Sequence, residues 1–212
     1  KALNFVFIIA SPMMIYFILF AKQGIFFLSG DAFAPAVVPM QLIMPTLLLI
    51  GITNILGIQI LVPLGYEKAV LVSEIVGAVI DLVVNALLIP VYQSSGAAIG
   101  TLLAEFAVMV VQCVALKNEI KTAFSDIKYL KIILAIILAS LASFWVTALN
   151  LHVFITLVIS AILFFGVYGL VLIIIKEKLV IEILPQLFSK LKHNSAYLRF
   201  LTYKTIKGIL LL

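Results

Sequence analysis

The chain is poor in charged residues and in the residue types that build catalytic or metal sites. Only 11% of its 212 residues are charged and 65% are hydrophobic, whereas soluble globular domains average about 25% and about 45–50%. The single cysteine, Cys113, excludes a disulfide framework within the chain and a cysteine-based zinc site. Two histidines, His152 and His193, are too few and too far apart for a zinc cluster. The composition indicates a multi-span membrane protein, and we expect no metal and no other cofactor.

Six segments are long and apolar enough to cross a membrane, which takes about 20 mostly apolar residues in a helix. They cover roughly residues 3–21, 35–61, 67–90, 96–116, 130–149 and 152–175. None shows the alternation of polar and apolar residues that is typical of a transmembrane β-barrel strand. Only helices and closed barrels pair all their backbone groups in lipid. We therefore predict an all-α integral membrane protein with six transmembrane helices.

The basic residues predict the orientation of these helices. Of the 14 Lys and Arg residues, all except Lys22 fall on one side of the predicted membrane. Because basic loops stay in the cytoplasm, we place loops 62–66 and 117–131 and the tail after 176 there. The net charge of +5 is thus a topology signal, and nucleic acid is not an expected partner.

Three parts follow along the chain. Residues 1–120 hold four transmembrane helices, residues 121–176 hold two additional ones, and 177–212 form a basic amphipathic tail on the anionic inner leaflet or a partly disordered one. The fifth predicted helix carries a ridge of small residues for close helix contact. This ridge consists of Ala135, Ala139, Ser143 and Thr147.

The beginning of the chain and the outer loop carry two further expectations. Since the chain starts at Lys1 and enters an apolar helix almost at once, we expect further helices of the same protein upstream. Residues 22–34 combine turn residues with phenylalanines, which predicts an outer loop lying at the membrane interface. The helix over 35–61 contains three prolines and Asn54. Such breaks either line a cavity or only shape helix packing.

Acidic residues at membrane depth are the strongest functional signal. Glu74 and Asp81 are seven residues apart, hence within about 20° on one helix face, and Asn85 lies one turn further on. Glu105 and Gln112 share one face of the next helix. A central Asp costs about 2.5–3.5 kcal/mol to insert, so these side chains are expected to face protein or water.

Two interpretations of the acids stay open. They form a proton- or cation-coupling cluster or a lining for a polar substrate, or they only hydrogen-bond neighbouring helices. The sequence contains no nucleophile–base pair, no glycine-rich phosphate loop and no metal-ligand spacing, so we do not expect an enzyme. The candidate substrate or ion pathway comprises Asp81, Glu105, Glu74, Asn85, Asn54 and Gln112.

Residues 85–105, NALLIPVYQSSGAAIGTLLAE, resemble a motif of Wzx-type polysaccharide flippases, which belong to the multidrug/oligosaccharidyl-lipid/polysaccharide exporter superfamily. Upstream, FLSGDAFAPA and ILGIQILVPLGYEKAV resemble an outer loop and a helix–turn–helix of the same family. The resemblance covers about residues 1–120, and the remaining helices match only in length and hydropathy. On the family's scheme the chain resembles helices nine to fourteen.

The resemblance implies a bacterial inner-membrane transporter acting in O-antigen lipopolysaccharide or capsule biosynthesis. Such flippases move undecaprenyl-pyrophosphate-linked oligosaccharides to the outer leaflet by alternating access, with H+ or Na+ as the expected coupling ion. Glu74 and Asp81 depart from the family, which often has neutral residues there. The chain also has no Lys or Arg at membrane depth to hold a pyrophosphate, so we expect such residues in the upstream helices. A cation-coupled multidrug exporter and a non-transporting membrane scaffold are the alternatives.

Overall fold

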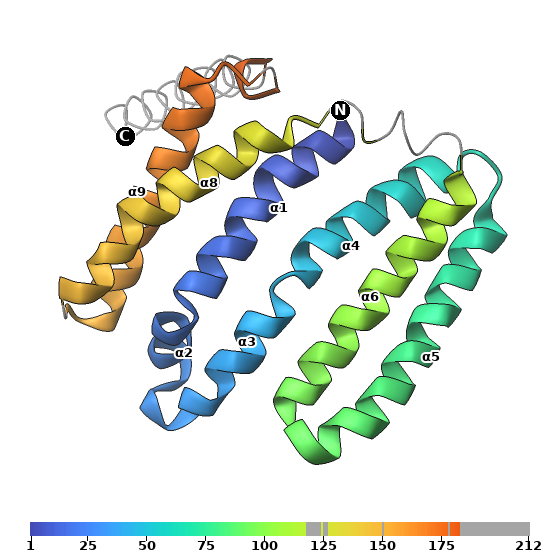
Figure 1. The fold of residues 1–212 in the computed structure, drawn as a ribbon, viewed down its shortest axis with the longest axis horizontal. Helices are drawn as coiled ribbons and strands as arrows, with labels where there is room; N and C mark the ends of the chain where they lie inside the picture. Colours follow the sequence, from blue (N-terminus) through green and yellow to red (C-terminus); the bar gives the residue numbers. More distant parts are fainter. Residues whose placement is uncertain (118–123, 125–126, 150, 178, 183–212) are drawn as a thin grey trace, which may run out of the picture. The chain divides into compact units, whose positions relative to one another are not determined.

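The computed structural model describes residues 1–117, 124, 127–149, 151–177 and 179–182, and every regular element among them is helical. Six of the helical stretches are long and apolar enough to cross a membrane. They are Ala2–Leu19, Asp31–Leu61, Glu67–Tyr92, Ser94–Leu116, Tyr129–Leu149 and Val153–Ile174. The predicted all-α membrane fold is therefore confirmed, with six candidate spans at the expected places (Figure 1).

The segment after the first span differs from the prediction. Helix α1 (Ala2–Leu19) is followed directly by α2 (Ala21–Ser29) and by the 3-10 turn η1 (Asp31–Ala36). The prediction of a loop over residues 22–34 was wrong. No proline interrupts residues 21–29, so their backbone can form helical hydrogen bonds. Gly30, with φ +82°, ends α2 in the left-handed region that glycine adopts without strain.

The second span is broken, as its prolines predict. It consists of η1, α3 (Val37–Ile43), α4 (Thr46–Asn54) and the π-helix η2 (Ile55–Leu61). Residues 44 and 45 form a turn between α3 and α4, where Pro45 has no N–H to continue the helical ladder. Figure 1 shows the resulting interruption between α3 and α4.

Helices α5 (Glu67–Tyr92) and α6 (Ser94–Leu116) share the most extensive helix–helix contact in the described part of the chain. A Cβ atom on Gly77 would lie 2.5 Å from Val108 Cγ2, and one on Gly96 would lie 2.5 Å from the Leu88 carbonyl oxygen. Glycines on both helices thus let the two backbones approach closely. The span predicted over 67–90 continues to Tyr92, and the turn to α6 shrinks to Gln93 at φ +51°.

Helix α1 also packs against α8 (Tyr129–Phe144), which the 3-10 turn η3 (Trp145–Leu149) extends. The predicted small-residue ridge on α8 is confirmed for three of its members: Ala135, Ala139 and Ser143 are fully buried. Thr147, the fourth member, is only half-buried.

Helix α9 (Val153–Ile174) is fastened to α1 by tyrosine side chains. Tyr16 Oη donates to the Leu157 carbonyl at 3.0 Å, and Tyr168 Oη donates to the Ile8 carbonyl at 2.8 Å. Because position 16 faces 157 and position 8 faces 168, the two helices are antiparallel. Helix α1 thus contacts α3, α4, α8 and α9. Helix α6 packs against α3, α4 and α5.

Residues Lys1–Val171 and Leu172–Leu212 form two compact units, and the site described below belongs to the first. The boundaries expected at 120 and 176 stay predictions. Most of the predicted tail 177–212 and of the predicted loop 117–131 lies outside the described residues. Residues 62–66 form the expected short turn between η2 and α5.

Candidate functional site in the membrane spans

A polar cavity of about 190 Å³ lies between α4, η2, α5 and α6. Its polar lining comes from three different spans, which puts oxygen- and nitrogen-bearing groups into an otherwise apolar part of the fold. The full lining is Ile50, Thr53, Asn54, Gly57, Ile58, Val70, Glu74, Glu105 and Gln112. Asn54 and Glu74 are exposed, so the cavity is open on one side.

Four of the six predicted pathway residues meet in this cavity. Asn54 comes from α4, Glu74 from α5, and Glu105 and Gln112 come from α6. Glu105 lies about 16 Å along the helix axis from Ser94 and about 18 Å from Lys117, hence near the middle of a span. The tertiary structure thus brings together polar residues from three separate apolar segments.

Gln112 is the most buried polar member of the cavity, with 1% of its surface exposed. Its Nε2 donates to Ser73 Oγ at 3.2 Å, and Ser73 Oγ donates in turn to the Val70 carbonyl at 2.7 Å. Gln112 Oε1 is buried and has no hydrogen-bond partner. A buried polar atom without a partner costs about 1–3 kcal/mol. A ligand in the cavity that donates a hydrogen bond to this oxygen would remove that cost.

The π-helix η2 was not predicted, and it shapes one wall of the cavity. The Val62 N–H bonds the Gly57 carbonyl at 3.0 Å, five residues back, and so widens the helix beside Gln112. A Cβ atom at Gly57 would lie 3.0 Å from Gln112 Nε2, so glycine makes room for the amide. Single π turns inside α-helices occur frequently at functional sites. The glycine at 57 was the only sequence signal for this feature.

Asp81 and Asn85, the other two predicted residues, lie outside the cavity. Both are half-buried on α5, and the Oδ1 atom of each is buried without a partner. Asn85 Oδ1 is directly against Gly100 of α6, so a Cβ atom at position 100 would require the Asn85 side chain to move. Asp81 is nevertheless close enough to Glu105 for the two carboxylates to interact electrostatically, and Glu105 lines the cavity.

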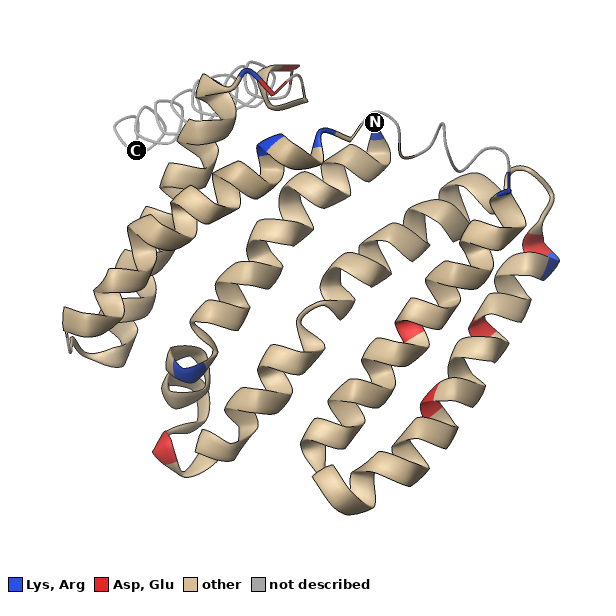
Figure 2. Cartoon of the chain, in the orientation of Figure 1, with Lys and Arg blue, Asp and Glu red and all other residues tan. Residues whose placement is uncertain are grey.

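Positive charge is missing from the interior of the described spans. Figure 2 shows acidic positions part-way along α5 and α6, whereas the basic positions of the spans lie at helix ends. Lys68 is the second residue of α5 and Lys131 is the third residue of α8. The cavity therefore combines two carboxylates, two amides and one hydroxyl with no cation of its own among the described residues.

Such a group of oxygen atoms can hold a proton or a small hard cation, for which carboxylate and carbonyl oxygens are the usual ligands. It does not suit a pyrophosphate, which two carboxylates would repel. No cluster of three or more His, Cys, Asp or Glu residues able to bind a metal occurs in the part of the chain that the structure describes.

Together, six apolar helices and a polar cavity among them define a multi-pass α-helical membrane protein with a polar site inside its spans. Comparison with known proteins yields no match to a family model, to a curated protein or to a solved structure.

Proposed function

We propose that this chain is part of a transporter that flips undecaprenyl-pyrophosphate-linked oligosaccharide repeat units from the inner to the outer leaflet of the bacterial inner membrane. The polar cavity serves in it as the coupling site, where H+ or Na+ binds and is released during alternating access. The chain is not an enzyme in this scheme, and further helices of the same protein hold the pyrophosphate.

The observation that carries the proposal is the cavity of Glu74, Glu105, Asn54 and Gln112. Ionisable groups inside membrane spans are expensive and mark ion pathways and proton relays. An exposed carboxylate such as Glu74 must face water or another polar surface rather than lipid. The resemblance of residues 85–105 to Wzx-type flippases supplies the substrate class, and the lysines at the helix ends support the orientation.

The absence of basic residues inside the described spans favours one second candidate function. A cation-coupled multidrug exporter needs acids and no buried cation to accept an organic cation, and the cavity has that character. A non-transporting scaffold, the third candidate, would use the same acids only to pair helices.

The test is the exchange Glu105→Gln in the complete protein, expressed in a strain that lacks the chromosomal copy. Because glutamine keeps the shape but cannot bind and release a proton, we expect surface polysaccharide to fall at least tenfold while lipid-linked repeat units accumulate on the cytoplasmic side. Glu67→Gln is the matched control, since Glu67 is the first residue of α5 and does not line the cavity.

Three results distinguish the candidates. Unchanged surface polysaccharide with loss of dye efflux supports the multidrug exporter instead. Loss of folded protein from the membrane, without a specific transport defect, supports the scaffold. If Glu105→Gln and Glu67→Gln reduce polysaccharide equally, the cavity is not the coupling site.

A further inference from the structure

One wall of the polar cavity belongs to a broken helix, and the other belongs to two unbroken helices. The first, here called the α4 wall, comes from α4 and η2, and the second, the α5–α6 wall, comes from α5 and α6. Helix α4 has only nine residues and lies between the turn at residues 44 and 45 and the π-helix η2. Prolines and π turns are the usual places at which a helix bends. The α4 wall is therefore bounded at each end by a point where the helix can bend.

The turn at residues 44 and 45 is held by few backbone hydrogen bonds. Pro45 has no N–H to donate to the carbonyl four residues back, as an unbroken α-helix requires. The Leu47 N–H bonds the Met44 carbonyl at 3.0 Å, only three residues back. Hinges consist of a few residues that absorb changes in φ and ψ. This turn can absorb such a change with the loss of fewer hydrogen bonds than the inside of an α-helix.

The two segments that flank the turn differ in how they are held. Before the turn, α3 is tied to α1 by Gln41, whose Nε2 donates to the Ile18 carbonyl at 3.0 Å. After the turn, Thr53 and Asn54 of α4 donate only to the Ile50 carbonyl of the same helix, at 3.2 and 2.9 Å. In the described part of the chain, no side-chain hydrogen bond joins α4 or η2 to α1, α5 or α6. Interhelical hydrogen bonding therefore holds α3 but not the α4 wall.

The α5–α6 wall is held together across its own helix contact. Gln112 of α6 donates a hydrogen bond to Ser73 of α5 at 3.2 Å, and both residues are buried. Gly77 and Gly96 let the backbones of the two helices approach closely. Moving the α4 wall away from α6 therefore gives up apolar contacts only, whereas parting α5 from α6 would break a buried hydrogen bond.

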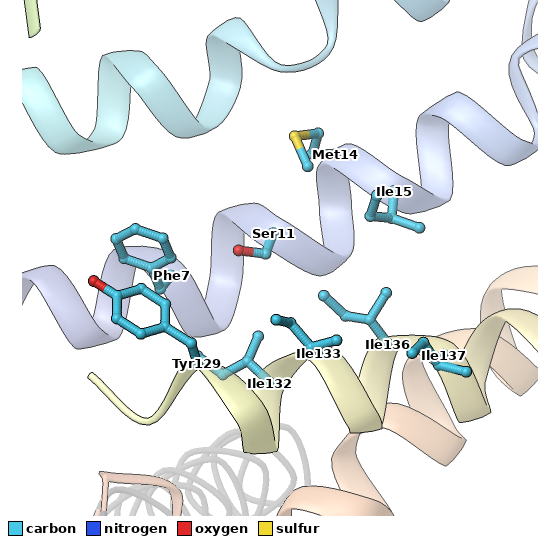
Figure 3. A pocket seen from close by; sticks show the side chains of 9 residues that line it. All are labelled: Phe7, Ser11, Met14, Ile15, Tyr129, Ile132, Ile133, Ile136 and Ile137. Atoms are coloured by element: carbon cyan, nitrogen blue, oxygen red, sulfur yellow. The ribbon is translucent and has the colours of Figure 1, made fainter.

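A second hollow of the fold shows that a proline in a span does not by itself produce a break. The apolar groove between α1 and α8 encloses about 320 Å³ and is lined by residues of these two continuous helices (Figure 3). Ser11 lines this groove and is followed by Pro12, yet α1 runs without interruption from Ala2 to Leu19. The break at Pro45 is thus a particular feature of the span that borders the polar cavity.

We propose that the α4 wall turns about Met44–Pro45 and thereby opens and closes the polar cavity to water. Its movement controls when an ion reaches Glu105 and Gln112 on the α5–α6 wall. The inference rests on the proposed function for the purpose of this opening, but the opening itself can be measured without any transport.

Two threonines of α4 provide a matched test. Thr46 and Thr53 are both 8% exposed and, being seven residues apart, lie on one helix face. Thr53 lines the cavity, whereas Thr46 lies beside the turn and does not line it. Each is exchanged for Cys in an otherwise cysteine-free background of the complete protein, which includes Cys113→Ala. The rate of modification by a water-soluble, positively charged methanethiosulfonate reagent is then measured in reconstituted vesicles.

We expect Thr53→Cys to react about tenfold faster than Thr46→Cys, because a local opening exposes the cavity face and not the turn. Pro45→Ala restores the missing N–H and stiffens the turn, so it lowers the rate at position 53 about fivefold. Pro12→Ala in α1 is the matched control and leaves that rate unchanged. If Pro45→Ala does not yield folded protein, Pro45→Leu restores the same N–H and takes its place.

Equal rates at positions 46 and 53 overturn the proposal, because the cavity face would then not be exposed selectively. An unchanged rate at position 53 in Pro45→Ala also overturns it, because the opening would then not use the turn. A lower rate at position 53 together with unchanged surface polysaccharide in Pro45→Ala supports the hinge and contradicts the coupling role proposed for the cavity.

Discussion

The helices around α6, called the α6 side, and those around α1, called the α1 side, pack in different ways. Around α6, polar groups from three spans surround a cavity, and buried oxygens of Asp81, Asn85 and Gln112 lack partners. Around α1, buried hydroxyls are satisfied: Tyr16 bonds the Leu157 carbonyl and Tyr168 bonds the Ile8 carbonyl. Since unsatisfied polar groups cost stability in lipid, these three oxygens on the α6 side carry a cost that the two tyrosine hydroxyls on the α1 side do not.

The difference separates a region suited to bind something from a region suited to hold helices together. Aromatic rings reinforce the α1 side, where Tyr16 contacts Phe164 and Phe165 of α9 at 5.5 and 5.2 Å between ring centroids. The α6 side instead brings helix backbones close together at glycines and leaves polar atoms free. Three substitutions test this contrast, and they follow in order of decreasing effect on stability.

The largest effect is expected for Gly96→Ala at the close contact of α5 and α6. Its Cβ would lie 2.5 Å from the Leu88 carbonyl oxygen and 2.6 Å from the carbonyl carbon, and backbone atoms cannot move aside. Overpacking of this kind costs about 1–3 kcal/mol. We expect a clear drop in the melting temperature of the purified protein. Size-exclusion chromatography after heating measures this drop.

Gly166→Ala on α9 is the control for this substitution, because nothing lies within 4 Å of its added Cβ. Alanine favours a helix over glycine by about 0.8–1.0 kcal/mol in water, so no loss of stability is expected. Equal losses for Gly96→Ala and Gly166→Ala would contradict the tight packing assigned to α5 and α6.

A smaller effect is expected for Tyr168→Phe on the α1 side. The exchange removes the 2.8 Å hydrogen bond to the Ile8 carbonyl and keeps the ring. Interhelical hydrogen bonds in membranes contribute about 0.6 kcal/mol on average, which predicts a small but measurable decrease in the melting temperature. Tyr92→Phe serves for comparison, because Tyr92 is exposed at the end of α5. An equally large decrease in melting temperature for Tyr92→Phe would contradict the role of Tyr168 in holding α9 against α1.

The smallest effect on stability is expected for Gln112→Met in the cavity. Methionine fills a similar volume, removes the unpartnered Oε1 and leaves Ser73 bonded to the Val70 carbonyl. Loss of the Nε2 hydrogen bond lowers the free energy of unfolding by about 0.5–1.5 kcal/mol, and removal of the unpaired oxygen raises it by about 1–3 kcal/mol.

We therefore expect a melting temperature that stays the same or rises, while surface polysaccharide falls in the complete protein. A large loss of stability in Gln112→Met would show that Gln112 is a structural residue, and the two sides of the unit would then not differ in the way described.

Much of the fold could be predicted because lipid imposes strong rules on sequence. The six spans follow from apolar length, and the small-residue ridge on α8 follows from its four-residue period. Helix α2 and the π-helix η2 escaped prediction for a physical reason. Both depend on local hydrogen-bond choices within segments whose composition suits a loop or an ordinary α-helix equally well.

The candidate residues themselves were predictable, because an acid or amide in an apolar span is conspicuous. Their grouping was not. The sequence by itself determined that this is a six-span all-α membrane protein with Glu74, Asp81 and Glu105 inside its spans. Only the tertiary structure decided that Asn54, Glu74, Glu105 and Gln112 share one cavity, while Asp81 and Asn85 lie against the α5–α6 contact. Helix periodicity defines a face within one helix, but the packing of α4, α5 and α6 determines which faces meet.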